Sequence, residues 1–210
     1  MSKIFILGLP RTGTTSLCAW FLEQGYKTAH TAYTQHSFDM AQVIADTPVF
    51  CDYPHLDRVF PDAKFIYLQR DIDAWLPSIQ IFLSKAVLQL ETNARGFNPV
   101  LSRVYAQVFD IHPGETDKIN FSHLRRCWEQ HRKSIEKYFE QRQSQLLTLD
   151  LSETFAREKL SGFLGIPLEG MSVIPKLNND GRVIAWDKIK HPLKIPSNAA
   201  GPLRRKYFDF

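Results

Sequence analysis

The chain has 210 residues, of which 44% are hydrophobic, and it carries a formal net charge of +4 at pH 7. This length suffices for one α/β domain with a buried core, so we expect a single domain over residues 1–210. No apolar run approaches the length of a membrane span, and no aromatic and basic motif favours nucleic acid as a partner. The modest positive charge suits a small anionic ligand.

The cysteines indicate a reducing compartment. Cys18, Cys51 and Cys127 are odd in number, and each falls in an apolar strand or helix pattern. We interpret them as reduced structural residues, which predicts a cytoplasmic protein. The apolar run from Ile4 to Leu9 is too short for a signal-peptide core. No spacing of His and Cys indicates zinc, and we expect no metal.

The first twenty residues combine a strand, a glycine-containing loop and a helix. Gly8 and Gly13 occupy the two glycine positions of the G-x-x-x-x-G phosphate loop, where a side chain would block an anion from the backbone. A nucleotide kinase carries Lys after the second glycine, whereas this chain carries Thr14 and has its cation at Arg11. The loop can still hold a phosphate through its amides, the helix N-terminus and its hydroxyls, which belong to Thr12, Thr14 and Thr15.

Strand and helix patterns alternate along the rest of the chain. We expect strands at residues 26–30, 49–51, 64–69 and 145–151, and helices at 15–24, 37–47, 71–90, 100–109, 122–141 and 152–163. This alternation predicts an α/β fold with a parallel sheet, whose ligands bind at the carboxyl ends of the strands. The residues expected at that edge are Arg11, His30, Asp52 and Arg70.

The segment from Pro10 to Thr15 resembles the 5′-phosphosulfate loop of the PAPS-dependent sulfotransferases. Seven residues separate Arg70 from Ser78, which resembles the R-x7-S pattern that binds the 3′-phosphate in that family. Asp52-Tyr53-Pro54 is also similar to the shorter, single-domain branch. The resemblance implies a three-layer P-loop-like fold with about five parallel strands flanked by helices. It also implies PAPS as sulfuryl donor, adenosine 3′,5′-bisphosphate as product, and no metal requirement.

The resemblance also implies roles for individual residues. Arg11 would replace the family's usual Lys at the leaving oxygen, while the loop would hold the 5′-phosphate. Arg204 and Arg205 are similar to the basic C-terminal element that clamps the cofactor. Two residues compete as general base, because Asp52 stands where cytosolic members have a His, and His30 stands where other branches have a Glu.

Several questions stay open at the level of sequence. A P-loop nucleotide-dependent phosphotransferase (kinase) and a non-catalytic nucleotide-binding protein are alternatives to a sulfotransferase. The acceptor is a small molecule or a glycan with a hydroxyl or amine, and its identity and the oligomeric state are undetermined. Residues 92–120 are a candidate lid or acceptor-binding insertion. Residues 170–210 are irregular and basic, and they either cover an anionic ligand or form a solvated end.

Overall fold

A computed structural model describes residues 2–92, 98–112, 115–142, 145–169, 171–175, 177 and 185–208, without the side chains of 88–92 and 205. The chain divides into two units, one formed by residues 1–69 with 143–210 and the other by residues 70–142. The first unit contains the sheet and the second contains three helices.

The first unit is built on one five-stranded sheet in which every pair of neighbouring strands is parallel. The strand order is β2-β3-β1-β4-β5, with bounds Thr28–Ala29, Val43–Ala45, Ile4–Ile6, Lys64–Gln69 and Leu146–Asp150. Ile6 lies opposite both Ala45 of β3 and Ile66 of β4. The strands therefore end at one edge, and the predicted α/β fold with about five parallel strands is confirmed.

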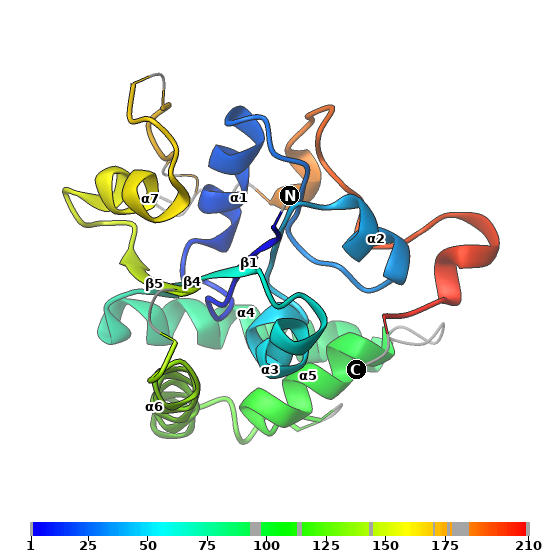
Figure 1. The fold of residues 1–210 in the computed structure, drawn as a ribbon. Coiled ribbons are helices and arrows are strands. Elements are labelled where there is room, and N and C mark those ends of the chain that lie inside the picture. The colour runs from blue at the N-terminus through cyan, green and yellow to red at the C-terminus, as the bar shows by residue number, and fades with distance from the viewer. Residues whose placement is uncertain are drawn as a thin grey trace. The chain divides into compact units, whose positions relative to one another are not determined.

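Helices cover both faces of this sheet. Ile4 and Ile6 belong to a buried cluster with residues of α1 (Thr14–Glu23) and α7 (Ala156–Leu164). Phe5 points to the opposite face, because side chains alternate along a strand. Its ring lies 5.6 Å from that of Phe60, the residue that ends α3 (Val49–Val59). Figure 1 shows α1 and α7 on one side of the strands and α3 on the other.

Two predicted elements are wrong, and they are neighbours in the chain. The helix expected at 37–47 ends early, because α2 covers Gln35–Met40 and β3 follows. The strand expected at 49–51 is instead the first turn of α3, which begins directly after Pro48. A short apolar run fits a buried strand or a buried helix equally well. A proline just before the first helical residue favours a helix start, since its missing N–H costs nothing there.

The second unit consists of α4 (Ile72–Thr92), α5 (Pro99–Phe109) and α6 (Phe121–Tyr138), close to the expected bounds. The ring centroids of Trp75 in α4 and Trp128 in α6 lie 4.6 Å apart. Of the expected insertion at 92–120, residues 93–97 and 113–114 lie outside the described part. No helix among the described residues is long and apolar enough to cross a membrane.

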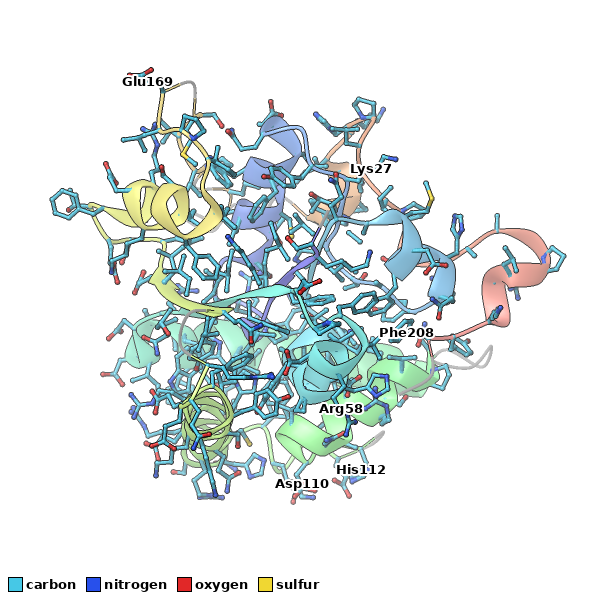
Figure 2. All side chains as sticks on the ribbon, in the orientation of Figure 1. Lys27, Arg58, Asp110, His112, Glu169 and Phe208 are labelled. Carbon is cyan, nitrogen blue, oxygen red and sulfur yellow. The ribbon has the colours of Figure 1, made fainter. Side chains whose placement is uncertain are left out.

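The C-terminal segment 185–208 runs along the outer edge of the sheet. The Thr28 N–H donates to the Leu193 carbonyl at 3.0 Å, and the Ile195 N–H donates to the Thr28 carbonyl at 2.9 Å. The edge of β2 is thereby covered. Near its end the ring of Phe208, labelled in Figure 2, stacks on Phe38 with centroids 4.1 Å apart. Parts of this segment are therefore packed against the fold, while other residues of it are exposed.

Candidate active site

The loop between β1 and α1 is a tight backbone cradle. A Cβ added to Gly8 would collide with Thr12 Oγ1 and lie 2.8 Å from Leu68 Cβ. Gly13 has a φ of 105°, a left-handed conformation that favours glycine. Both the N–H and the Oγ1 of Thr12 donate to the Leu9 carbonyl, at 3.2 and 2.8 Å. The loop is thus a fixed turn that leads directly into the N-terminus of α1.

His30, which directly follows β2, is joined to the start of α1. Its Nε2 lies 3.1 Å from Thr14 Oγ1 and 3.0 Å from Thr15 Oγ1. The Trp186 ring from the C-terminal segment stacks on the imidazole, with centroids 5.5 Å apart and an interplanar angle of 28°. The structure therefore brings three of the predicted site residues together and adds an aromatic wall.

Asp46 is a site residue that the sequence analysis missed. It follows β3, and its Oδ2 lies 3.8 Å from His30 Nε2. Its Oδ1 accepts hydrogen bonds from the N–H and the Oγ1 of Thr47, at 2.7 and 3.1 Å. Asp46 was hidden inside the helix wrongly expected at 37–47. The signal that could have identified it is an acidic residue directly after the apolar run Val43–Ala45.

Opposing effects act on the imidazole of His30. Burial lowers its pKa, the carboxylate of Asp46 raises it, and the ammonium of Lys194 lowers it, with a net shift below the ordinary 6.5. His30 is therefore neutral at pH 7, with one ring nitrogen free to accept a proton. The same carboxylate reinforces the effect of burial on Tyr33, whose pKa is raised to about 12.

The other predicted residues occupy different places. Asp52 was expected directly after a strand. It instead lies buried in the first turn of α3, where its backbone departs from helical geometry. That turn begins after Pro48, whose carbonyl accepts a hydrogen bond from the Asp52 N–H at 3.0 Å. The expectation that Asp52 directly follows a strand is therefore wrong.

The remaining predicted residues come from three segments. Pro10 and Arg11 lie in the cradle, and Arg11 has a φ of 75°. Arg70 directly follows β4, and Ser78 lies in α4, so both belong to the second unit. Arg204 is exposed in the 3-10 helix η3 (Gly201–Arg205), which precedes the strand-like pairing of Tyr207 with Thr34. The side chain of Arg205 is outside the described part.

Comparison with known families decides the relationship. A family model described as a sulfotransferase domain matches residues 31–183, which is more than half of the chain. The chain belongs to the sulfotransferase family. The matched range contains Asp46, Asp52, Arg70 and Ser78 and begins directly after His30. The comparison with curated proteins found no match.

The cradle of this sulfotransferase family member fits an anionic group. Only glycine leaves room at position 8, and the loop leads into the N-terminus of α1, where no side chain caps the helix. The first N–H groups of a helix have no partner within the helix and carry the positive end of its dipole. The hydroxyls of Thr14 and Thr15 stand at the same helix start. Among the described residues, no group of three His, Cys, Asp or Glu is placed to hold a metal ion.

Proposed function

We propose that the protein transfers a sulfuryl group from PAPS to a hydroxyl or amine of a small molecule or glycan. The family match supports sulfuryl transfer in general. The observation that carries the specific proposal is the position of His30 Nε2 within hydrogen-bond distance of the Thr14 and Thr15 hydroxyls. This position connects a partly buried, neutral imidazole to the hydroxyls at the start of α1, beside the loop that would hold the 5′-phosphate.

The donor-binding residues follow from the cradle and from the resemblance. Pro10 to Thr15, with the N-terminus of α1, would hold the 5′-phosphate. Arg70 and Ser78 would bind the 3′-phosphate, and Arg204 with Arg205 would add positive charge. When bound, PAPS supplies the sulfuryl group and leaves as adenosine 3′,5′-bisphosphate.

We assign the general base to His30 and keep Asp52 as the alternative. His30 Nε2 takes the proton from the acceptor hydroxyl as the new oxygen–sulfur bond forms, and it later returns that proton to water. Arg11 stabilises the negative charge that develops on the leaving oxygen as the old sulfur–oxygen bond breaks. Neutral imidazole suits this role because its lone pair can accept a proton at pH 7.

Two variants test the base. His30→Gln should keep the affinity for adenosine 3′,5′-bisphosphate, measured by calorimetry, and lose turnover of labelled PAPS by about 100-fold or more. Asp52→Asn should keep both. His36→Gln, at an exposed position of α2, is the matched control and should behave like the wild type. An active His30→Gln beside an inactive Asp52→Asn would move the base to Asp52.

A thermal-shift comparison tests the reaction class. Stabilisation by adenosine 3′,5′-bisphosphate without magnesium supports the proposal, whereas stabilisation only by Mg-ATP would favour the phosphotransferase alternative. Transfer from labelled PAPS to a broad acceptor panel then separates an enzyme from a binding protein. Binding of the bisphosphate without modification of any acceptor would favour the non-catalytic alternative.

The cysteines support the cytoplasmic location that we propose. Cys18, Cys51 and Cys127 form no disulfide in the described part of the chain. Burial and the nearby charge of Asp46 raise the pKa of Cys18, so this thiol stays protonated and unreactive. Free, buried thiols are typical of proteins in reducing compartments.

A further inference from the structure

One ring nitrogen of His30 has more polar neighbours than it can form hydrogen bonds with at one time. Nε2 lies within hydrogen-bond distance of Thr14 Oγ1 and Thr15 Oγ1, and 3.8 Å from Asp46 Oδ2. A ring nitrogen offers either one lone pair or one N–H, so it makes one strong hydrogen bond at a time. The neutral nitrogen can accept from a threonine hydroxyl, and the protonated one can donate to the carboxylate. The three neighbours therefore compete for Nε2.

The carboxylate of Asp46 is fixed in a position from which it can accept a hydrogen bond from a protonated Nε2. Its Oδ1 is fixed by the N–H and Oγ1 of Thr47, while Oδ2 faces the imidazole. Its side chain is only 12% exposed, so water screens its charge weakly.

Besides Asp46, no negative charge among the described residues raises the pKa of His30. The neighbours from α1, Thr14 and Thr15, are neutral hydroxyls, and Trp186 is an uncharged ring. Lys194 is a cation whose Nζ lies 4.9 Å from the Trp186 ring centroid, and its charge acts against protonation of His30. Among the charged groups that act on His30, Asp46 is thus the one that favours the protonated form.

We propose that Asp46 is a positioning residue for His30, whose carboxylate accepts from the new Nε2–H and stabilises the imidazolium that forms when His30 takes the proton of the acceptor. The role deepens the proposed function, because it rests on His30 as the general base. It also explains how the site works with donor bound. Once the hydroxyls of Thr14 and Thr15 donate to the 5′-phosphate, they no longer occupy Nε2. Its lone pair can then take the acceptor proton, and the carboxylate of Asp46 lies beside the N–H that forms.

The first test needs no activity. The pKa of His30 is measured by NMR titration of its ring C–H signal in the ligand-free full chain, with the signal identified by its loss in His30→Gln. Asp46→Asn should lower this pKa below the wild-type value, and Asp46→Glu should restore part of it. Asp39→Asn, at an exposed position of α2, is the matched control and should leave it unchanged. An unchanged or raised pKa in Asp46→Asn would overturn the proposal.

The second test separates positioning from mere structural support. Asp46→Asn should keep the affinity for adenosine 3′,5′-bisphosphate within about twofold and lower kcat/KM about tenfold or more, the size of one lost charge-assisted hydrogen bond. The acid limb of its pH profile should move to lower pH. A lower rate with an unmoved limb would overturn the proposal in favour of a structural role. A shifted NMR pKa in a protein that sulfates no acceptor would instead count against the proposed function alone.

Discussion

Gly8→Ala is expected to destabilise the fold through a collision that the structure locates. The new Cβ would meet Thr12 Oγ1 and approach Leu68 Cβ to 2.8 Å. Leu68 is fully buried in β4, and Thr12 is 4% exposed with its hydroxyl bonded to the Leu9 carbonyl. Neither neighbour can move without loss of packing or of that hydrogen bond.

The cost of Gly8→Ala can be worked out from these contacts. Forcing an extra carbon into a packed site costs about 1–3 kcal/mol. Losing the hydrogen bond between Thr12 and Leu9 adds about 1 kcal/mol. The free energy of unfolding should therefore fall by about 2–4 kcal/mol, which lowers the Tm of a chain of this length by about 5–15 °C.

Gly162→Ala is the matched control for this substitution. Gly162 lies within α7, and an added Cβ there meets no atom within 4 Å. Alanine inside a helix is more stable than glycine by about 0.5–1 kcal/mol, so the control should raise stability. Urea unfolding followed by circular dichroism measures both midpoints. A wild-type midpoint for Gly8→Ala, or shifts of the two variants in the same direction, would refute the reasoning.

Three further predictions concern binding, pH and metal. Arg70→Ala should weaken binding of adenosine 3′,5′-bisphosphate by about 2 kcal/mol or more in calorimetry. The control Arg125→Ala, which removes an exposed ion pair with Asp73, should bind like the wild type. If Arg70→Ala also binds like the wild type, Arg70 is not part of the site. Burial lowers the pKa of His30 in the folded state below 6.5, so as pH drops the unfolded chain protonates this imidazole before the folded chain does. The free energy of unfolding should therefore fall as pH drops from above 6.5 towards the folded-state pKa. His30→Gln should lose less unfolding free energy than the wild type between pH 7.5 and 5, as measured by urea titrations. Equal losses for the two proteins over this pH range would contradict the prediction. Sulfuryl transfer should persist in EDTA, and a rate that returns only with added magnesium would contradict the proposed chemistry.

The sequence predicted the parts of the fold that carry strong local signals. β4 occupies the expected residues 64–69, because a nearly continuous apolar run rich in aromatic residues after a Pro-Asp turn favours a covered strand. The start of α1 was predicted within one residue, since two glycines and a threonine pair mark where the loop ends. These signals depend only on neighbouring residues, so a single sequence contains them.

The segment around β3 could not be predicted in the same way. Val43–Ala45 is only three residues long, and its assignment as a strand depends on hydrogen bonding to β1 on one side and β2 on the other. Those partners are distant in the chain, so no local period identifies them. Because the strand was expected at 49–51 instead of 43–45, the carboxylate expected directly after it was Asp52, six residues beyond Asp46. One wrong element therefore changed the identity of a site residue.

The position of Asp46 sharpens the contrast with phosphotransferases. P-loop phosphotransferases hold magnesium with an Asp near the loop and neutralise the phosphates with a Lys. Here Thr14 replaces that Lys, and the carboxylate of Asp46 faces an imidazole. A transferring sulfuryl group resembles neutral SO3, whereas a phosphoryl group resembles anionic PO3, so its transition state needs less positive charge. An arginine and a buried His–Asp pair can supply what sulfuryl transfer requires, because removing the acceptor proton is the remaining demand on the site.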